Sequence, residues 1–111
     1  MELIVEPTYD RSSFYRLYLP LSMKTLIMYS KPGCHLCEGL QEKIKTLPIQ
    51  LEIRDITTNE AWFQKYQYEI PVLCAPQEGA PEQPLPRLSP RAPISRVAQV
   101  IQKYIGPLNN V

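Results

Sequence analysis

The hydrophobic pattern between residues 26 and 54 restricts the possible folds more than any other feature of the chain. Residues 26–29 (LIMY) form a continuous apolar run, which is typical of a strand buried on both faces. From Leu36 the apolar residues recur at helical spacing as far as Pro48, and residues 49–54 then alternate between apolar and polar. The apolar face of this helix consists of Leu36, Leu40, Ile44 and Leu47. The order predicts a βαβ unit, whose two strands are parallel and joined by a right-handed crossover.

A short helix is predicted directly after the second strand. Thr57 and Glu60 have the spacing of a capping box, in which each side chain caps the backbone N–H of the other residue. The inner side of this helix carries three aromatic residues, Trp62, Phe63 and Tyr66. We assign Trp62 to the core, with a substrate-facing aromatic residue as the alternative. Asp55, at the end of the preceding strand, is assigned to a turn or a helix cap.

Two further strands and a last helix complete the predicted fold. The apolar run at residues 70–75 predicts a third strand. Residues 85–88 predict a fourth strand, which the neighbouring Pro84 and Pro86 restrict to a sheet edge. Apolar residues at helical spacing predict a helix over residues 94–105, which a Gly-Pro pair then ends. The predicted fold class is α/β, a βαβ unit followed by ββα, with a mixed four-stranded sheet flanked by helices.

Length and composition limit the class of protein. The chain of 111 residues suggests one domain, which we expect over residues 23–111, after an irregular N-terminal extension at residues 1–22. A net charge of +1 gives no general affinity for nucleic acid. No stretch reaches the length of a membrane span, and the N-terminus lacks the pattern of a signal peptide. Three cysteines are too few for a secreted disulfide scaffold, so we expect a cytoplasmic protein. We also expect the protein to be a monomer.

Cys34 and Cys37 are the residues best suited to carry chemistry. They lie at the predicted junction of the first strand and the first helix, where unpaired backbone N–H groups and the helix dipole favour a negative charge. A dithiol centre needs one thiolate that attacks and a second thiol that resolves the mixed disulfide. We expect Cys34 to attack and the less exposed Cys37 to resolve. Lys31, and His35 when protonated, would lower the pKa of the Cys34 thiol.

Other interpretations of the cysteine pair stay open. Buried thiols can pack as small hydrophobes, although this does not explain a location at a strand-to-helix turn after Pro-Gly. A zinc site needs two more ligands and only Cys74 and His35 remain, so we expect no closed metal site within one chain. An iron–sulfur cluster shared between two chains is a further alternative. Cys74 is expected on the third strand as a structural thiol, with a regulatory role as the alternative.

The stretch Lys31-Pro-Gly-Cys-His-Leu-Cys37, placed after a strand, resembles the active-site segment of glutaredoxins, which belong to the thioredoxin superfamily. The resemblance covers residues 24–75 and, more loosely, the chain as far as residue 105. It implies a thioredoxin-like fold with a cis peptide bond before Pro71. It also implies that the backbone of Ile70 is free to pair with an extended thiol substrate, as an added strand would.

The chain also departs from the glutaredoxin pattern. His35 and Leu36 stand between the cysteines, where glutaredoxins commonly have proline and an aromatic residue. The turn that holds the γ-glutamyl group of glutathione has no counterpart in residues 88–93, and Glu69 adds a negative charge near that tripeptide. We therefore expect no tightly bound cofactor and keep glutathione as one candidate co-substrate. Arg87 and Arg91 could meet a substrate carboxylate, although we favour a solvated loop for both.

These observations predict a dithiol–disulfide oxidoreductase of glutaredoxin type, which reduces protein or glutathione mixed disulfides and is itself reduced by an external thiol. The predicted catalytic residues are Cys34 and Cys37, and the predicted substrate-binding residues are Tyr29, Ile70 and Pro71. Tyr29 ends the first strand close to Cys34, where it either borders the redox groove or packs in the core. The alternatives are a thioredoxin-like binding module, which could hold the shared cluster, and a redox sensor that acts through residues 1–22.

Overall fold

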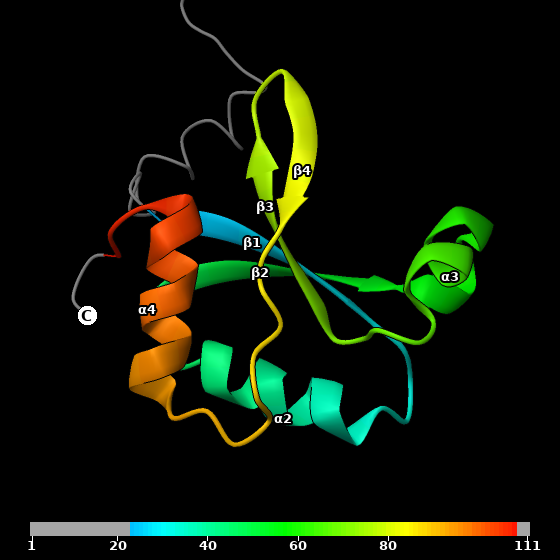
Figure 1. Ribbon diagram of the computed structural model, residues 1–111, viewed down its shortest axis with the longest axis horizontal. Coiled ribbons are helices and arrows are strands. Elements are labelled where there is room, and N and C mark those ends of the chain that lie inside the picture. Colours follow the sequence, from blue (N-terminus) through cyan, green and yellow to red (C-terminus); the bar gives the residue numbers. More distant parts are fainter. Residues whose placement is uncertain (1–22, 109–111) are drawn as a thin grey trace, which may run out of the picture.

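The computed structural model describes residues 23–108, which form a four-stranded sheet with three α-helices (Figure 1). The predicted extension at residues 1–22 lies outside the described residues, as do residues 109–111. In chain order the elements are β1 (Lys24–Ser30), α2 (His35–Ile44), β2 (Ile49–Asp55), the 3₁₀ turn η1 (Ile56–Thr58), α3 (Glu60–Tyr66), β3 (Val72–Gln77), β4 (Ala80–Pro84) and α4 (Ile94–Ile105). Their order confirms the predicted βαβ unit followed by ββα. Within residues 23–108, no helix is both long and apolar enough to cross a membrane.

The sheet has the strand order β2-β1-β3-β4 and is mixed, as predicted. β1 runs parallel to β2 over its whole length, from the pair Lys24–Ile49 to the pair Ser30–Asp55. β3 is antiparallel to β1 on its other side, and β4 extends the sheet as an antiparallel neighbour of β3. The parallel pair requires a crossover, which α2 supplies, whereas a tight turn is enough to join β3 and β4.

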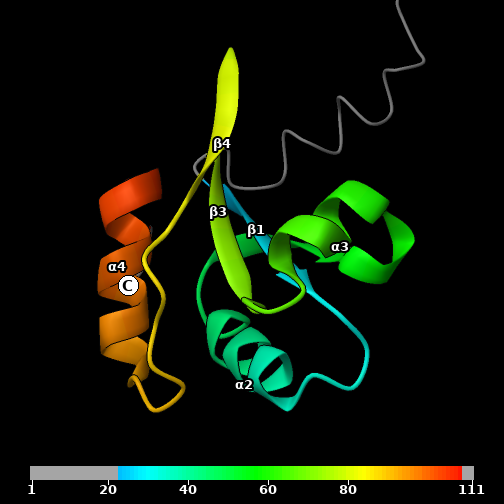
Figure 2. The ribbon, with the colours of Figure 1, turned by 45° about the vertical axis from the view of Figure 1, so that its right-hand side comes forward.

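Two hydrophobic clusters lie on opposite faces of the sheet. In β1, Leu26 and Met28 contribute to the cluster beneath α2 and α4, while Ile27 and Tyr29 contribute to the cluster beneath α3. Figure 2 shows α3 across the sheet from α4. Because successive side chains of a strand point to opposite faces, a strand with both faces covered must be apolar throughout. β1 is therefore apolar throughout because both of its faces are covered, as its sequence predicted.

The prediction of the fourth strand was wrong in position. β4 spans Ala80–Pro84, and residues 85–88 continue as an extended segment outside the sheet. The hairpin turns at Gly79, whose φ of +69° favours glycine, so the second strand begins directly after this residue. Leu85 still donates its N–H to the carbonyl of Leu73 at 2.8 Å, but Pro86 has no N–H to continue the ladder.

The predicted capping box of Thr57 and Glu60 is also wrong. Asn59 is the N-cap of α3, and its side-chain oxygen accepts the N–H of Trp62 at 3.1 Å. Thr57 belongs instead to η1, which Asp55 caps by accepting the N–H of Thr57 at 2.9 Å. The assignment of Asp55 to a cap is therefore confirmed. Asparagine is among the best N-cap residues, so Asn59 takes the position one turn before Phe63.

Leu36 does not share the buried face of α2 that the apolar spacing predicted. Its side chain is 51% exposed, whereas Cys37 is 2% exposed and Ile44 is fully buried. The helix begins at His35, and its buried face starts at Cys37 and includes Ile44, so Leu36 lies off this face. Leu36 consequently remains an apolar side chain on the surface, directly between the two cysteines.

Candidate active site at the start of α2

Cys34 and Cys37 form a disulfide across the first turn of α2, with their Cα atoms 5.3 Å apart. The chain enters this turn through Gly33, whose φ of +83° is rarely adopted by other residues. Cys34 is the N-cap of α2, and its Sγ accepts the backbone N–H of Cys37 at 3.2 Å. Cys34 is half-buried and Cys37 is almost fully buried, so the first sulfur is the more accessible of the two.

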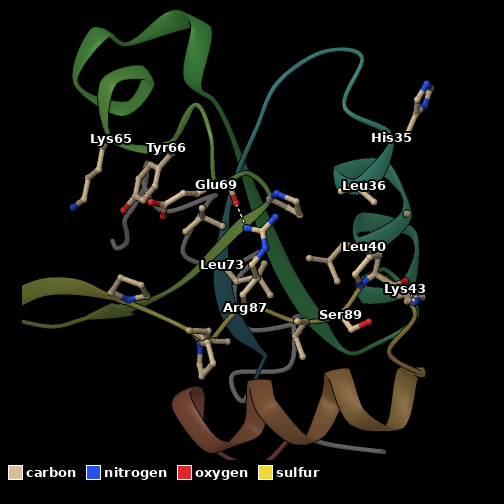
Figure 3. Close-up of a pocket in the computed structure, with 18 residues that line it drawn as sticks. His35, Leu36, Leu40, Lys43, Lys65, Tyr66, Glu69, Leu73, Arg87 and Ser89 are labelled. Atoms are coloured by element: carbon tan, nitrogen blue, oxygen red, sulfur yellow. Dashed lines mark hydrogen bonds between the residues drawn. The ribbon is translucent and has the colours of Figure 1, made fainter.

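The start of α2 favours an anionic sulfur at Cys34 once the disulfide is reduced. The N–H of Cys37 already points at this sulfur, and the positive end of the helix dipole lies at the same place. The side chains of Lys31 and His35 are exposed, and His35 lies 3.3 Å from Glu38 through its Nδ1 atom. The His35 side chain points away from the groove that α2 forms with β3 and residues 84–90, which is described next (Figure 3). The effect of Lys31 and His35 on the pKa of the Cys34 thiol stays a prediction.

A groove of about 640 Å³ opens along α2 and is lined by His35 and Leu36, the two residues between the cysteines (Figure 3). One wall is α2, from His35 and Leu36 to Lys43 near the end of the helix. A second wall runs from Lys65 and Tyr66, at the end of α3, through the loop before β3 to the start of that strand. The third wall is the extended segment of residues 84–90. The groove is therefore bounded by three segments that are distant in the sequence.

The loop before β3 contributes Pro71 to the groove. The Ile70–Pro71 peptide bond is cis, which confirms what the glutaredoxin resemblance implied. The side chain of Ile70 packs against the cluster on the α3 side instead of lining the groove. The register of β4 with β3 begins at Cys74, so the edge of β3 at Val72 borders the groove. Substrate binding by Ile70 and Pro71 stays a prediction.

The third wall of the groove is tied down at both ends. Lys43 of α2 donates from its Nζ atom to the carbonyl of Pro90 at 3.0 Å and to that of Ala92 at 2.7 Å. At the other end, the hydrogen bond between Leu85 and Leu73 joins the segment to β3. The closely spaced prolines, which restrict φ, keep the chain extended between these two ties.

Replacing Lys43 by methionine should loosen this wall while leaving the length and apolar stem of the side chain. Two charge-assisted hydrogen bonds to backbone carbonyls are lost, and we expect the free energy of unfolding to fall by about 1–2 kcal/mol, since the site is partly exposed. Amide hydrogen exchange of Arg91 and Ala92, whose N–H groups donate to Ser89, should become faster, because the segment opens locally. Lys45→Met, at an exposed position of the same helix end, is the matched control. Equal exchange in both variants would contradict the role given to Lys43.

Tyr29 lies in the core on the α3 side, outside the groove. Its hydroxyl donates to Glu82 and accepts from Arg54 at 2.8 Å, and Arg54 also donates to Glu82 at 3.0 Å. Burial, followed by the hydrogen bond to Glu82, raises the pKa of Tyr29 to about 12. Trp62 packs edge-on against Tyr29, with ring centroids 5.6 Å apart. Of the two alternatives for Tyr29, the geometry supports packing, and the same contact supports the core assignment of Trp62.

Cys74 is fully buried on β3, within the cluster beneath α3. Burial is the main cause that raises the pKa of its thiol to about 11, and the charge of Glu82 adds to the shift. The thiol is therefore protonated at neutral pH and shielded from reagents. These properties favour a structural role over a regulatory one.

The stability of the oxidised protein should fall as the pH rises above about 9. An unfolded chain releases cysteine and tyrosine protons near their ordinary values, about 8.5 and 10. In the native protein these protons are released at higher pH, because the pKa is about 11 at Cys74 and about 12 at Tyr29. Because the unfolded state then binds fewer protons than the native state, the free energy of unfolding decreases with pH in this range. Urea unfolding at pH values of about 7.5, 9 and 10.5 measures the effect, which Cys74→Ala should reduce and which a constant midpoint would refute.

Sequence reasoning missed most of the third wall of the groove. The sequence favours a solvated loop for Arg87 and Arg91, and both residues are exposed, but Arg87 also lines the groove and donates to the carbonyl of Glu69. Arg91 is exposed and is not among the lining residues. The closely spaced prolines were the sequence signal for this wall, because proline-rich segments are extended and stiff.

The fold and the site together define a thioredoxin-like protein with a disulfide-forming pair at the start of a helix and a cis-proline in the adjoining groove. The sequence matches the family model of the Glutaredoxin-like domain (DUF836) over residues 25–102, and the chain belongs to this family. Neither a curated protein nor a solved structure matches the chain. The matched region contains the disulfide and Pro71, so family and geometry both support a redox function.

Proposed function

We propose that the protein is a dithiol–disulfide oxidoreductase of glutaredoxin type, which reduces mixed disulfides of proteins or of glutathione. The observation that carries the proposal is the disulfide between Cys34 and Cys37 at the N-terminus of α2, beside the groove. A thiolate at Cys34 is stabilised there by the helix, and its partner sulfur is held within bonding reach.

The first step is attack of the Cys34 thiolate on one sulfur of the substrate disulfide. A bond forms between Cys34 and that sulfur, the substrate disulfide breaks, and the other sulfur leaves as a thiolate that takes up a proton. Cys34 suits this role because its sulfur is the more accessible one. The groove beside the cysteines then holds the part of the substrate that remains attached.

The second step is attack of Cys37 on the mixed disulfide. Its thiolate bonds to the Cys34 sulfur and displaces the second substrate sulfur, so the substrate has gained two electrons and the cysteine pair has lost two. Cys37 is almost fully buried, which directs it to its neighbour instead of to an external disulfide. An external thiol must then reduce the Cys34–Cys37 bond, either two glutathione molecules or one dithiol.

Turnover of a neutral disulfide tests this proposal. Catalytic amounts of the protein should accelerate the reduction of bis(2-hydroxyethyl) disulfide, with glutathione or with dithiothreitol as the reductant. Acceleration with glutathione would identify the physiological class of reductant, whereas acceleration with the dithiol alone would point to a dithiol protein. If neither reductant gives a rate above the uncatalysed reaction, the proposal is wrong.

The reduction potential of the Cys34–Cys37 couple would give the direction of electron flow. A value near that of thioredoxin, about −270 mV, would favour a reductant, and a value near about −120 mV would favour an oxidant. Equilibration with thiol–disulfide buffers, followed by alkylation and mass spectrometry, measures it. Cys74 does not interfere in the folded protein because its thiol is buried and protonated.

A further inference from the structure

The groove beside the disulfide has an uneven distribution of charge. Three cationic side chains line it, those of Lys43, Lys65 and Arg87, against the single carboxylate of Glu69. Most of the remaining lining is apolar, and includes Leu36, Leu40, Leu85 and Leu88. An occupant of this groove should therefore combine apolar side chains with negative charge.

Arg87 is the cation that faces the middle of the groove. It starts from the extended segment and donates from Nη1 to the carbonyl of Glu69, in the loop before β3 (Figure 3). The guanidinium thus spans two walls of the groove. Within residues 23–108 no carboxylate lies at ion-pairing distance from Arg87. A guanidinium has five N–H donors, so those not used by Glu69 can bind a carboxylate.

The position of Arg87 is fixed by the ties of its segment. Lys43 holds the chain at Pro90 and Ala92, and the hydrogen bond of Leu85 holds it at β3. A cation on a tethered segment loses less side-chain and backbone freedom on binding than one on a loose loop. These ties hold the backbone on both sides of Arg87, and the hydrogen bond to the carbonyl of Glu69 orients its guanidinium at the groove.

The edge of β3 indicates the form of the occupant. Val72 and Pro71 line the groove beyond the point where β4 pairs with β3, because the β4 register starts at Cys74. On this side the carbonyl of Leu73 already accepts the N–H of Leu85, and Val72 pairs with Tyr29 of β1, so a bound peptide would pair with the loop before Val72. An extended peptide beside this loop can place alternate side chains into neighbouring pockets. The half-exposed Leu36, next to Cys34, offers an apolar contact for a residue close to the substrate cysteine.

We propose that Arg87 selects substrates: the groove binds an extended segment of a disulfide-bonded protein that carries an aspartate or glutamate within a few residues of its cysteine. This inference rests on the proposed function and adds its substrate class. The carboxylate binds the free donors of Arg87 while the cysteine sulfur lies at Cys34. Glu69 disfavours a second carboxylate on the same side, which argues for a protein segment over the doubly charged glutathione.

Matched peptides test the selection. Each short peptide carries one cysteine as a mixed disulfide with 2-mercaptoethanol, and members of a pair have Glu or Gln at the same position, one to three residues from the cysteine. Reduction is measured with dithiothreitol, after subtraction of the uncatalysed rate for each peptide. At least one Glu peptide should show a kcat/KM about threefold to tenfold above that of its Gln partner, since the pair is open to solvent and screened. The preference should shrink as salt is added.

Arg87→Gln should remove the preference for Glu, so that in this variant each Glu peptide reacts no faster than its Gln partner. Arg91→Gln is the matched control, because this exposed neighbour has the same charge but does not line the groove. The inference is overturned if every Glu and Gln pair reacts equally with the native protein, or if Arg87→Gln keeps the preference. It is also overturned if only glutathione disulfide depends on Arg87.

A binding measurement separates this inference from the proposed function. Peptides with serine in place of cysteine cannot react, and their affinity for the oxidised protein can be measured by isothermal titration calorimetry. Tighter binding of a Glu peptide, lost in Arg87→Gln, supports the selection even if no disulfide is turned over. Turnover of the neutral disulfide without any Glu preference in binding or rate leaves the proposed function intact and refutes the role of Arg87.

Discussion

Cys34→Ser should reduce turnover to the uncatalysed background, whereas Cys37→Ser should accumulate a stable mixed disulfide with its substrate. A serine hydroxyl does not ionise near neutral pH and forms no disulfide, so the first step cannot occur without Cys34. Without Cys37 the first step still occurs, but nothing nearby displaces the substrate, since Cys74 is buried in the cluster on the opposite face of the sheet. Intact-mass spectrometry should show the Cys37→Ser protein heavier by one substrate thiol.

The matched control for both variants is Cys74→Ala. This change leaves the pair at the start of α2 untouched, so turnover should equal that of the native protein. Cys37→Ser is expected to keep activity on glutathionylated substrates if free glutathione can resolve the intermediate. Full activity of Cys34→Ser, or a substrate adduct on Cys37 in that variant, would contradict the assignment of the attacking thiol.

Ile101→Ala should cause the largest loss of stability among single substitutions in α4. The side chain is fully buried and belongs to the cluster that joins α2 and α4 to the sheet. Its removal costs the transfer free energy of three carbon atoms and leaves a cavity, so we expect a loss of about 2–5 kcal/mol. A domain of this size has a total stability of about 5–15 kcal/mol, and the urea midpoint should therefore fall sharply.

Ile94→Ala is the control for this prediction. Ile94 begins the same helix but is 39% exposed, so the same chemical change removes much less buried surface. Alanine is also the better helix former, and the net effect should be within about 0.5 kcal/mol. Equal losses at the two positions would mean that the two side chains are buried to the same degree, contrary to the packing described above.

Local patterns predicted the elements well because their causes are local. The apolar run of β1 and the helical spacing of α4 each show which side chains are buried. This pattern can be recognised within a short window of consecutive residues. The cap of α3 was missed because three candidate side chains, those of Thr57, Thr58 and Asn59, stand at consecutive positions, and only the backbone path selects Asn59. The fourth strand was misplaced because the turn at Gly79 was overlooked in favour of the apolar residues at 85–88.

The candidate site was predictable only where its residues are close in sequence. The cysteine pair and its place at a strand-to-helix turn follow from nine consecutive residues, and Pro71 followed from a family resemblance. Tyr29 was assigned to substrate binding because it lies near Cys34 along the chain, yet β1 directs its side chain to the opposite face of the sheet. Proximity in sequence says nothing about the face, which alternates with every residue of a strand.

The amino-acid sequence by itself determined the order of strands and helices and the chemistry of two sulfurs at the start of α2. The tertiary structure alone decided that Arg87 lines a groove beside them and that Tyr29 is held by Arg54 and Glu82 in the core. The physical reason is that periodicity records which face of an element is buried, whereas the segment that covers this face comes from elsewhere in the chain. That partner is selected by packing across the whole domain, and no local pattern encodes it.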